Sequence, residues 1–332
     1  MIKNGWCYLA LGLFVCSPIS LCLSQDSSIK YPYPFEATGN PIITHIRTAD
    51  PSAHVWADGK LWLYCSHDMD DATSYYSMDG YHVFSTGDLV HWTDWGEVLH
   101  SRQVKWGGAG TMWAPDCAYK NGKYFFYFPH KDKTNTWRTG VAISDKPQGP
   151  FVSEDDYIEG TSGIDPCCFI DDDGSAYLYF GKAQVAKLKD NMKELAEAPR
   201  DLDIGTEKPS GLEGSYMHKR NGLYYFSWSS PSKGCYSIGK SPYGPFEFKG
   251  AVKAMPPGAQ DHHSILDFKG KTYYFYHVGD YLNGGRFRRN ICIDELHYND
   301  DGTIQKIVPT KGGEAANDKN NLIPRVFDQE NN

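Results

Sequence analysis

Hydrophobic and polar residues recur along this chain in the pattern of a β-hairpin. A turn that contains a glycine is followed by an apolar and aromatic run, as in Asp173-Gly174-Ser175-Ala176-Tyr177-Leu178-Tyr179. Asp-Gly and Asn-Gly turns between such runs are typical of hairpins. The same form returns at four other turn glycines, which are Gly59, Gly122, Gly222 and Gly270.

The spacing of these turns indicates a repeat fold. Successive turn glycines are 63, 52, 48 and 48 residues apart (122 − 59, 174 − 122, 222 − 174, 270 − 222). Second hairpins with their own turns lie between the copies, for example at 85–92, 144–151 and 241–246. Two hairpins give four strands per unit, which is the composition of a propeller blade. The pattern therefore predicts an all-β chain folded as a five-bladed β-propeller.

Two segments depart from the repeat. Residues 187–195, within the stretch 183–199, have a partly helical pattern and predict one short helix. The first unit carries an insertion at 68–80, whose acidic residues resemble a calcium-binding loop only loosely because the glycine and the terminal glutamate of that motif are misplaced. We expect this insertion to be a solvated loop over the mouth of the propeller.

A fixed position in the repeat carries acidic residues. Nine residues before each turn glycine stand Asp50, Trp113, Asp165, Glu213 and Asp261. At about 3.3 Å per residue, this position lies at the far end of the strand before the turn, so the five side chains should converge at one mouth. An aspartate before a proline, as in Asp50-Pro51 and Asp165-Pro166, can also simply cap the start of a strand. A ring of carboxylates needs a chemical reason, because like charges repel, and this favours a functional site.

Paired carboxylates with different pKa values are what glycosidic hydrolysis requires. Glu213 has the longest reach of the four acidic residues, and burial among aromatic and acidic groups should raise its pKa, so it is the candidate acid. Asp50 or Asp165 is the candidate base. Trp113 provides a flat face on which a sugar ring can stack.

Five runs in this order resemble glycoside hydrolase family 43, the five-bladed propeller enzymes that act on arabinose- and xylose-containing polysaccharides. The resemblance covers residues from about 40 to about 310. The matching runs are Thr48-Ala49-Asp50-Pro51-Ser52-Ala53-His54, Ser66-His67-Asp68, Met112-Trp113-Ala114-Pro115-Asp116-Cys117, Gly163-Ile164-Asp165-Pro166 with Phe169-Ile170-Asp171-Asp172-Asp173-Gly174, and Glu213-Gly214-Ser215-Tyr216-Met217-His218-Lys219-Arg220-Asn221-Gly222.

The resemblance implies roles for single residues. Asp50 would be the general base, Asp165 the carboxylate that sets the pKa and orientation of the acid, and Glu213 the general acid. Inversion at the anomeric carbon is expected, with base and acid about 6.5 to 9.5 Å apart. Arg289 is expected to reach the sugar pocket, because alternation along a strand turns its neighbour Arg288 to the other face.

The family also often has a calcium ion or a water cluster on the propeller axis. The matching run is Asp261-His262-His263-Ser264, and His262 is the expected metal contact. A lone histidine is equally compatible with a structural hydrogen bond. No organic cofactor is expected.

The substrate is expected to be an arabinose- or xylose-containing oligosaccharide or polysaccharide. The first prediction is an exo-acting α-L-arabinofuranosidase on arabinoxylan or arabinan. The alternatives are a β-xylosidase, an endo-acting arabinanase or xylanase, and, from another class, a non-catalytic carbohydrate-binding propeller. Cys167-Cys168 and Ser215-Tyr216 depart from the usual family residues beside the pocket and bear on substrate choice.

The N-terminal residues predict export. Residues 1–24 combine Lys3, an apolar run from Trp6 to Cys16 and small residues near Ser24, which is typical of a secretory signal peptide. A membrane span is not expected because this run is shorter than about 20 residues. A lipid anchor on Cys22 fits less well because Leu21 precedes it. Residues 25–332 are expected to form the single catalytic propeller, with a polar tail at 311–332.

Charge excludes one class of partner. The formal net charge is −8 at pH 7 and becomes −9 without residues 1–24, whose single charged side chain is Lys3. Nucleic acid is therefore not an expected partner. The sequence carries no indication of oligomeric state. Six cysteines follow residue 24, and we expect them to be buried as small hydrophobic side chains; they are Cys65, Cys117, Cys167, Cys168, Cys235 and Cys292.

Overall fold

The computed structural model describes residues 29–231, 233–254, 261–279, 281 and 284–310. By internal contacts the chain divides into a short unit, Met1–Lys30, and a second unit, Tyr31–Asn332, which holds all the strands described below. The predicted signal peptide (1–24) and polar tail (311–332) lie outside the described residues and stay predictions. The described residues contain no helix long and apolar enough to cross a membrane.

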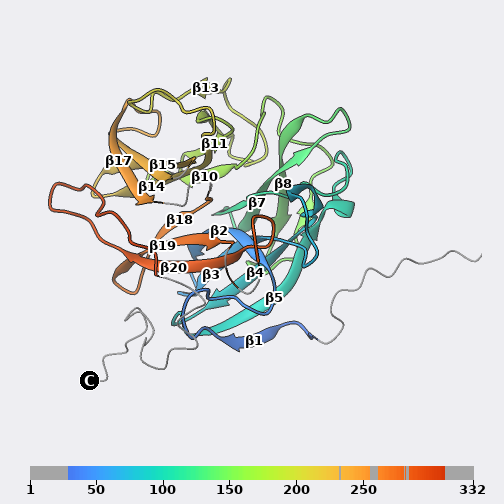
Figure 1. Cartoon of the computed structure of the whole chain (residues 1–332). Helices are drawn as coiled ribbons and strands as arrows, with labels where there is room; N and C mark the ends of the chain where they lie inside the picture. The colour runs from blue at the N-terminus through green and yellow to red at the C-terminus, as the bar shows by residue number, and fades with distance from the viewer. Residues whose placement is uncertain (1–28, 232, 255–260, 280, 282–283, 311–332) are drawn as a thin grey trace, which may run out of the picture. The chain divides into compact units, whose positions relative to one another are not determined.

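The second unit is a five-bladed β-propeller, as predicted, and each blade is one antiparallel sheet (Figure 1). Blade one has the order β1-β5-β4-β3-β2, with β1 Tyr33–Glu36, β2 Thr48–Val55, β3 Leu61–His67, β4 Gly80–Thr86 and β5 His91–His100. Blade two contains β6 Asp116–Lys120, β7 Lys123–Lys131, β8 Trp137–Ser144 and β9 Val152–Ser153. Blade three contains β10 Cys167–Ile170, β11 Ala176–Phe180, β12 Gln184–Lys187 and β13 Arg200–Asp201.

Blade four contains β14 Glu213–Arg220, β15 Leu223–Ser230, β16 Lys233–Gly239 and β17 Phe246–Ala254. Blade five contains β18 Ser264–Phe268, β19 Lys271–Val278 and β20 Asn290–Leu296. Two short 3₁₀ helices, Tyr75–Ser77 and Ser101–Gln103, lie in the loops. The sheets thus have five, four, four, four and three strands, so the expectation of four strands in every blade is correct only for the middle three.

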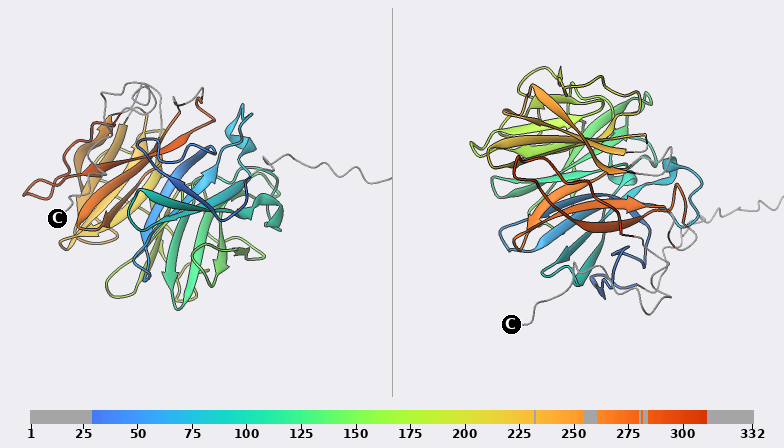
Figure 2. Two further views of the ribbon diagram at one scale, coloured as in Figure 1. Left: turned by 90° about the horizontal axis from the view of Figure 1, so that it is seen from below. Right: turned by 60° about the vertical axis from the view of Figure 1, so that its left-hand side comes forward.

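The ring closes between the first and last blades. Figures 1 and 2 show the orange strands of blade five beside the blue strands of blade one. The backbone N–H groups of Ile42 and Thr48 donate to the carbonyl oxygens of Ile291 (2.8 Å) and Arg289 (3.1 Å). These bonds bring Arg289, near the end of the chain, next to the first inner strand.

The predicted hairpin turns form in all five blades. All five turn glycines have positive φ, between 71° and 80°. In the three two-residue turns the preceding residue, Asn121, Asn221 or Lys269, has positive φ as well, as a type I′ turn requires. The turns fix the register of each hairpin. The register then sets where the residue nine positions before the turn glycine lies in the blade.

The apolar strand after each turn is buried on both faces. In β7, Phe126 and Phe128 pack in the cluster between blades one and two, whereas Phe125 and Tyr127 pack in the cluster between blades two and three. Side chains alternate along a strand, so a blade that lies between two others needs apolar residues at every position. This packing explains why the repeat has continuous rather than alternating hydrophobicity.

The predicted helix at 187–195 is wrong. The segment begins in β12, then turns at Met192, whose φ is 61°, and returns through a bridge between Leu188 and Leu195. Lysine and glutamate have high helix propensity, so this stretch looked helical in the sequence. In the structure its first residues pair with β11, and this pairing decides its conformation. The six cysteines after residue 24 are all buried, as expected, and none of them forms a disulfide with another described cysteine.

Candidate active site

The five residues at the repeat position line one pocket of about 210 Å³. Each blade contributes one of them, from the leading end of its inner strand or from the loop before it; they are Asp50, Trp113, Asp165, Glu213 and Asp261. The structure therefore brings together the residues that the repeat predicted to converge. Arg289 and His262 line the same pocket.

The backbone is unusual where these side chains leave it. Asp50 and Asp165 have positive φ, 56° and 58°, which is uncommon for a residue with a Cβ atom. The pairing of β2 with β3 shifts register between Ala49 and Ser52, so Asp50 lies in a bulge. Gly214, directly after Glu213, also has positive φ (64°), and a Cβ atom there would lie 3.0 Å from the Asp261 carbonyl oxygen. Bulges and left-handed residues of this kind re-aim side chains at sheet ends.

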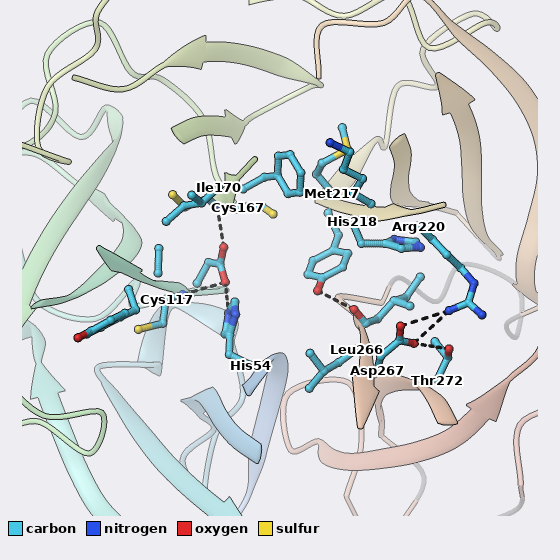
Figure 3. A pocket seen from close by; sticks show the side chains of 18 of the residues that line it. His54, Cys117, Cys167, Ile170, Met217, His218, Arg220, Leu266, Asp267 and Thr272 are labelled. Atoms are coloured by element: carbon cyan, nitrogen blue, oxygen red, sulfur yellow. Dashed lines mark hydrogen bonds and ion pairs between the residues drawn. The ribbon is translucent and has the colours of Figure 1, made fainter. Parts of the chain in front are cut away.

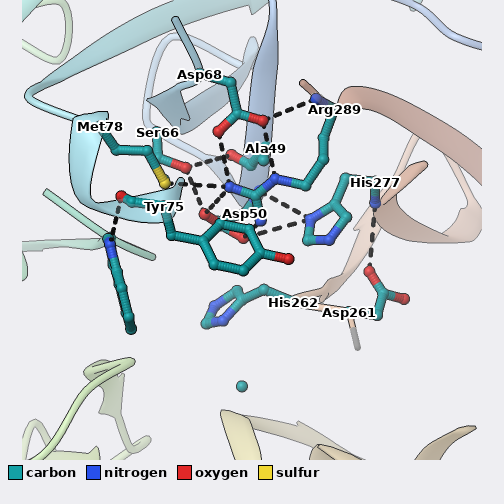
Figure 4. Close-up of polar contacts among 12 residues, drawn as sticks. Ala49, Asp50, Ser66, Asp68, Tyr75, Met78, Asp261, His262, His277 and Arg289 are labelled. Atoms are coloured by element: carbon teal, nitrogen blue, oxygen red, sulfur yellow. Dashed lines mark hydrogen bonds and ion pairs between the residues drawn. The ribbon is translucent and has the colours of Figure 1, made fainter. Parts of the chain in front are cut away.

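Asp50 is held in its ionised form by several partners. Arg289 donates from Nη1 to Oδ1 (3.0 Å) and from Nη2 to Oδ2 (3.3 Å), and the Ser66 hydroxyl donates to Oδ2 (Figure 4). His277 Nδ1 lies 3.3 Å from Oδ1. Burial alone would raise the pKa of Asp50, but Arg289 and then His277 outweigh it, and the pKa lies well below its usual range.

Asp68 fixes the arginine that binds Asp50. It is fully buried, and its carboxylate accepts from Arg289 Nε (2.9 Å), Nη2 (2.8 Å) and the backbone N–H (2.8 Å). The expectation of a solvated loop at 68–80 is therefore wrong at its first residue, because this ion pair holds Asp68 inside the protein. Asp68 belongs to the Ser66-His67-Asp68 run, which was the available sequence signal for a site residue here.

Glu213 has the opposite environment. It is partly buried in the pocket, and its side chain makes no hydrogen bond or ion pair with any other described residue. Burial, then the negative charges of Asp165 and Asp50, raise the pKa of Glu213 to about 8. This carboxyl group is therefore protonated at neutral pH and able to donate a proton.

Asp165 lies directly against the backbone that carries Glu213. Its Oδ2 accepts from the Gly214 N–H at 2.7 Å, and His262 Nδ1 is 3.9 Å from the same oxygen. A carboxylate held here affects Glu213 in two ways. Its charge opposes ionisation of Glu213, and its hydrogen bond fixes the orientation of the strand end.

Aromatic side chains form one wall of the pocket. Trp113 donates from Nε1 to the Tyr75 carbonyl oxygen (2.9 Å) and packs against Trp137 with ring centroids 4.4 Å apart. Tyr75, from the 3₁₀ helix of the insertion, lines the pocket and packs edge-on against Phe287 at 4.6 Å. The insertion, which was expected to lie over the mouth, thus contributes side chains to the pocket wall.

His262 is buried in the pocket wall, and its Nδ1 has no hydrogen-bond partner within reach among the described residues. Apart from the Asp165 carboxylate 3.9 Å away, this buried nitrogen has no polar neighbour within hydrogen-bond distance among the described residues, which is compatible with contact to an ion on the propeller axis. However, the described part of the chain contains no group of three or more His, Cys, Asp or Glu side chains arranged to hold a metal ion. Calcium prefers six to eight oxygen ligands, so water would have to supply most of them. Metal contact by His262 stays a prediction.

A second, larger cavity of about 410 Å³ opens at the other ends of the same inner strands (Figure 3). His54 and Trp56 of blade one line it, four and six residues along from Asp50, which places it about 13 to 20 Å from the carboxylate pocket along the strand. Its buried carboxylate, Asp116, accepts from the backbone N–H of Cys168 (2.6 Å) and lies 2.8 Å from His54 Nε2.

Some site residues were not predicted from the sequence. His277, at the end of β19, and Met78, after the 3₁₀ helix of the insertion, both line the carboxylate pocket. Neither lies at the repeat position or in a run that resembles the family. Of the two neighbouring arginines, Arg289 points into the pocket as expected, while Arg288 donates to the Gly284 carbonyl oxygen at 3.0 Å.

Comparison with known proteins gives consistent matches. Residues 38–304 match the family described as glycosyl hydrolases family 43. "Xylosidase/arabinosidase 43A" of Humicola insolens is 39% identical over 321 residues, covering 80% of this chain and 98% of that protein. The "Beta-xylosidase" of Xylanibacter ruminicola is 36% identical over 308 residues, covering 78% and 96%.

A solved structure shares the fold at similar identity. It is CoXyl43, described as a GH43 β-xylosidase/α-arabinofuranosidase from a compost microbial metagenome, in complex with xylotriose and in a calcium-free form. Its TM-score is 0.77 at 37% identity, covering 83% of this chain and 98% of that one. The propeller, the ring of carboxylates and these matches agree, and the chain belongs to glycosyl hydrolase family 43 and is a glycosidase.

Proposed function

We propose that this glycosidase is an inverting, exo-acting enzyme that releases terminal pentoses from xylan- or arabinan-type chains. The observation that carries the proposal is the contrast within one small pocket. Asp50 is paired with a buried arginine, whereas Glu213 has no such partner among the described residues and a pKa raised to about 8. One ionised and one protonated carboxyl group facing the same space are what hydrolysis of a glycosidic bond needs.

In the proposed mechanism Glu213 donates its proton to the leaving-group oxygen. Asp50, from blade one, accepts a proton from the attacking water. Asp165 acts through Glu213, since it binds the Gly214 N–H and its charge keeps the acid protonated. Base and acid come from blades that are not neighbours in the ring. Inversion requires the two carboxyl groups to stand about 6.5 to 9.5 Å apart with a water between them.

The size of the pocket supports exo action. About 210 Å³ is below the range of roughly 300 to 1,000 Å³ typical of sites for larger ligands. Tyr75 and Trp113 from two blades wall the pocket, so one terminal sugar ring fits better than the middle of a polymer. This argues against the endo-acting alternative.

The names of the relatives support β-D-xylosides as the first substrate. The relatives that are 36 to 39% identical include xylosidase/arabinosidases and a β-xylosidase. The "Arabinoxylan arabinofuranohydrolase" of Bacillus subtilis is 30% identical, and this chain spans 65% of its length. We therefore propose terminal β-D-xylose as the main substrate and terminal α-L-arabinofuranose as a second one, which reverses the order expected from the sequence. The non-catalytic alternative does not agree with membership of an enzyme family.

The test is a product analysis with acid-site variants. Wild-type protein should release xylose from xylobiose, and NMR should show the α-anomer first, as inversion predicts. Glu213→Gln should lower kcat/KM on xylobiose by about 10² to 10⁴-fold, but much less on an aryl xyloside whose leaving group departs without protonation. Full activity of Glu213→Gln on xylobiose, or β-xylose as the first product, would contradict the proposal.

Two further expectations remain proposals. Export through residues 1–24 would place the enzyme outside the cytoplasm, with a lipid anchor on Cys22 as the less favoured form. Calcium on the propeller axis, contacted by His262, would have a structural role, and no step of the mechanism above depends on it.

A further inference from the structure

The fifth residue of the carboxylate ring, Asp261, has no role in the mechanism above. It is 2% exposed and lines the same pocket as Asp50 and Glu213. Its Oδ1 accepts from the backbone N–H of His277 at 3.3 Å (Figure 4). Its Oδ2 lies 2.5 Å from Lys253 Nζ. Both carboxylate oxygens therefore have partners on other strands.

Lys253 is an unusual residue at its position. It lies on β17, the edge strand of blade four, yet it is only 3% exposed. Its Nζ lies 3.8 Å from the ring centroid of Tyr276 and 5.6 Å from that of Tyr274. A lysine is almost never fully buried unless it is paired, and Asp261 is the partner here.

The pair is connected to the proposed base. His277 Nδ1 lies 3.2 Å from the backbone nitrogen of Asp50 and 3.3 Å from its Oδ1. Asp261 holds the backbone of that histidine, and Lys253 holds Asp261. The contacts thus run from an edge strand of blade four, through blade five, to Asp50 in blade one.

Stability alone does not explain this arrangement. A buried ion pair costs desolvation energy that its attraction often fails to offset, and well-packed apolar residues commonly replace such pairs without loss of stability. In this pocket the pair also has an electrostatic effect. Without Lys253, Asp261 would be an uncompensated buried carboxylate bonded to the backbone of His277, the histidine that contacts Asp50.

We propose that Lys253 and Asp261 form a positioning pair that holds His277 against Asp50, in which Lys253 compensates the charge of the Asp261 carboxylate. Neither residue touches the sugar or the reacting atoms in this proposal. It rests on the proposed function, because it assigns Asp50 as the base.

The first test compares Lys253→Met with the double variant Lys253→Met/Asp261→Asn. On xylobiose, Lys253→Met should lower kcat by about 10- to 100-fold, the range expected for a misplaced catalytic group, with KM changed less than about threefold. The double variant has no uncompensated carboxylate at position 261 and keeps an oxygen for the His277 N–H. It should recover kcat to within about fivefold of wild type.

Lys219→Met is the matched control. It breaks another lysine–aspartate pair, Lys219 with Asp171 at 2.6 Å, on an inner strand but outside the carboxylate pocket. Its kcat should stay near the wild-type value. Wild-type kcat in folded Lys253→Met, or equal loss in the single and double variants, would overturn the proposal.

A second comparison applies if Lys253→Met does not fold. Asp261→Asn keeps an acceptor for the His277 N–H, whereas Asp261→Ala removes it. Asp261→Ala should have a kcat at least about tenfold below that of Asp261→Asn, and equal values would overturn the proposal. Glu213→Gln separates failure of this proposal from failure of the proposed function. If Glu213→Gln is as active as wild type on xylobiose, the proposed function is wrong. If Glu213→Gln is inactive while the Lys253 and Asp261 variants keep full kcat, only the positioning role is wrong.

Discussion

The two ends of the inner strands carry similar side chains in different states. In the far cavity, Asp116, the first residue of β6, accepts from the Ser52 hydroxyl (2.5 Å) and from the backbone N–H groups of Cys117 (2.8 Å) and Cys168 (2.6 Å), and it contacts His54. At the mouth, no described residue donates in this way to Glu213. A carboxylate that many donors bind is part of the scaffold, and one that lacks donors in a buried pocket is available for proton transfer.

The mouth also separates its own carboxylates. Arg289 compensates Asp50, Lys253 compensates Asp261, and the Gly214 N–H binds Asp165. Among the acidic residues at the repeat position, Glu213 has no cation or N–H donor bound to its side chain in the described part of the chain. A proton therefore neutralises it. The difference between the two ends is therefore one of charge balance rather than of residue type.

Replacing the proposed base should have the largest effect. Asp50→Asn should lower kcat on xylobiose by about 10² to 10⁴-fold, because the amide cannot accept a proton from water. Asp116→Asn at the far end should leave kcat near wild type but lower the free energy of unfolding by about 1 to 3 kcal/mol, since its amide would face backbone donors. Urea unfolding and steady-state kinetics measure both. Comparable losses of kcat would break the distinction between the ends.

Asp68→Asn should have the next largest effect. The amide cannot accept from both Nε and Nη2 of Arg289, so the arginine that binds Asp50 loses its fixed orientation. We expect kcat to fall by about 10- to 100-fold with a small change in KM. If KM rises instead while kcat is unchanged, Arg289 acts in sugar binding rather than on the base.

The pH profile should report the raised pKa of Glu213. The acid must be protonated to act, so kcat/KM should fall as the pH rises through about 8. Asp165→Asn removes a negative charge that raises this pKa, and the alkaline limb should move to lower pH. The lowered pKa of Asp50 keeps the base ionised throughout the neutral range. An alkaline limb that Asp165→Asn leaves in place would show that the charge of Asp165 does not set the pKa of Glu213.

The smallest expected effect concerns the aromatic residues. Trp113→Ala should raise KM by up to about tenfold, the equivalent of losing a stacking contact of about 0.5 to 1.5 kcal/mol. Trp56, which stacks on His54 at the far end with ring centroids 4.8 Å apart, is the matched control. Trp56→Ala should not change KM, and a similar rise in both variants would indicate that the far cavity also binds substrate.

Much of the site was predictable because the repeat is regular. Each turn glycine sets a hairpin register, so counting nine residues back was enough to bring Asp50, Asp165 and Glu213 to one pocket. The helix at 187–195 failed because composition, not pairing, suggested it. The insertion at 68–80 was misjudged because nothing local shows that Asp68 meets Arg289, 221 residues away.

The sequence by itself determined the hairpins, the number of blades and which residues meet at the mouth, because these follow from turn chemistry and from the regular spacing of the turns along the chain. Only the tertiary structure decided which carboxylates are ionised. Arg289 joins Asp50 across 239 residues when the last blade closes on the first, and Lys253 reaches Asp261 from an edge strand. Charge state depends on such partners and on burial, and neither is visible until the ring is closed.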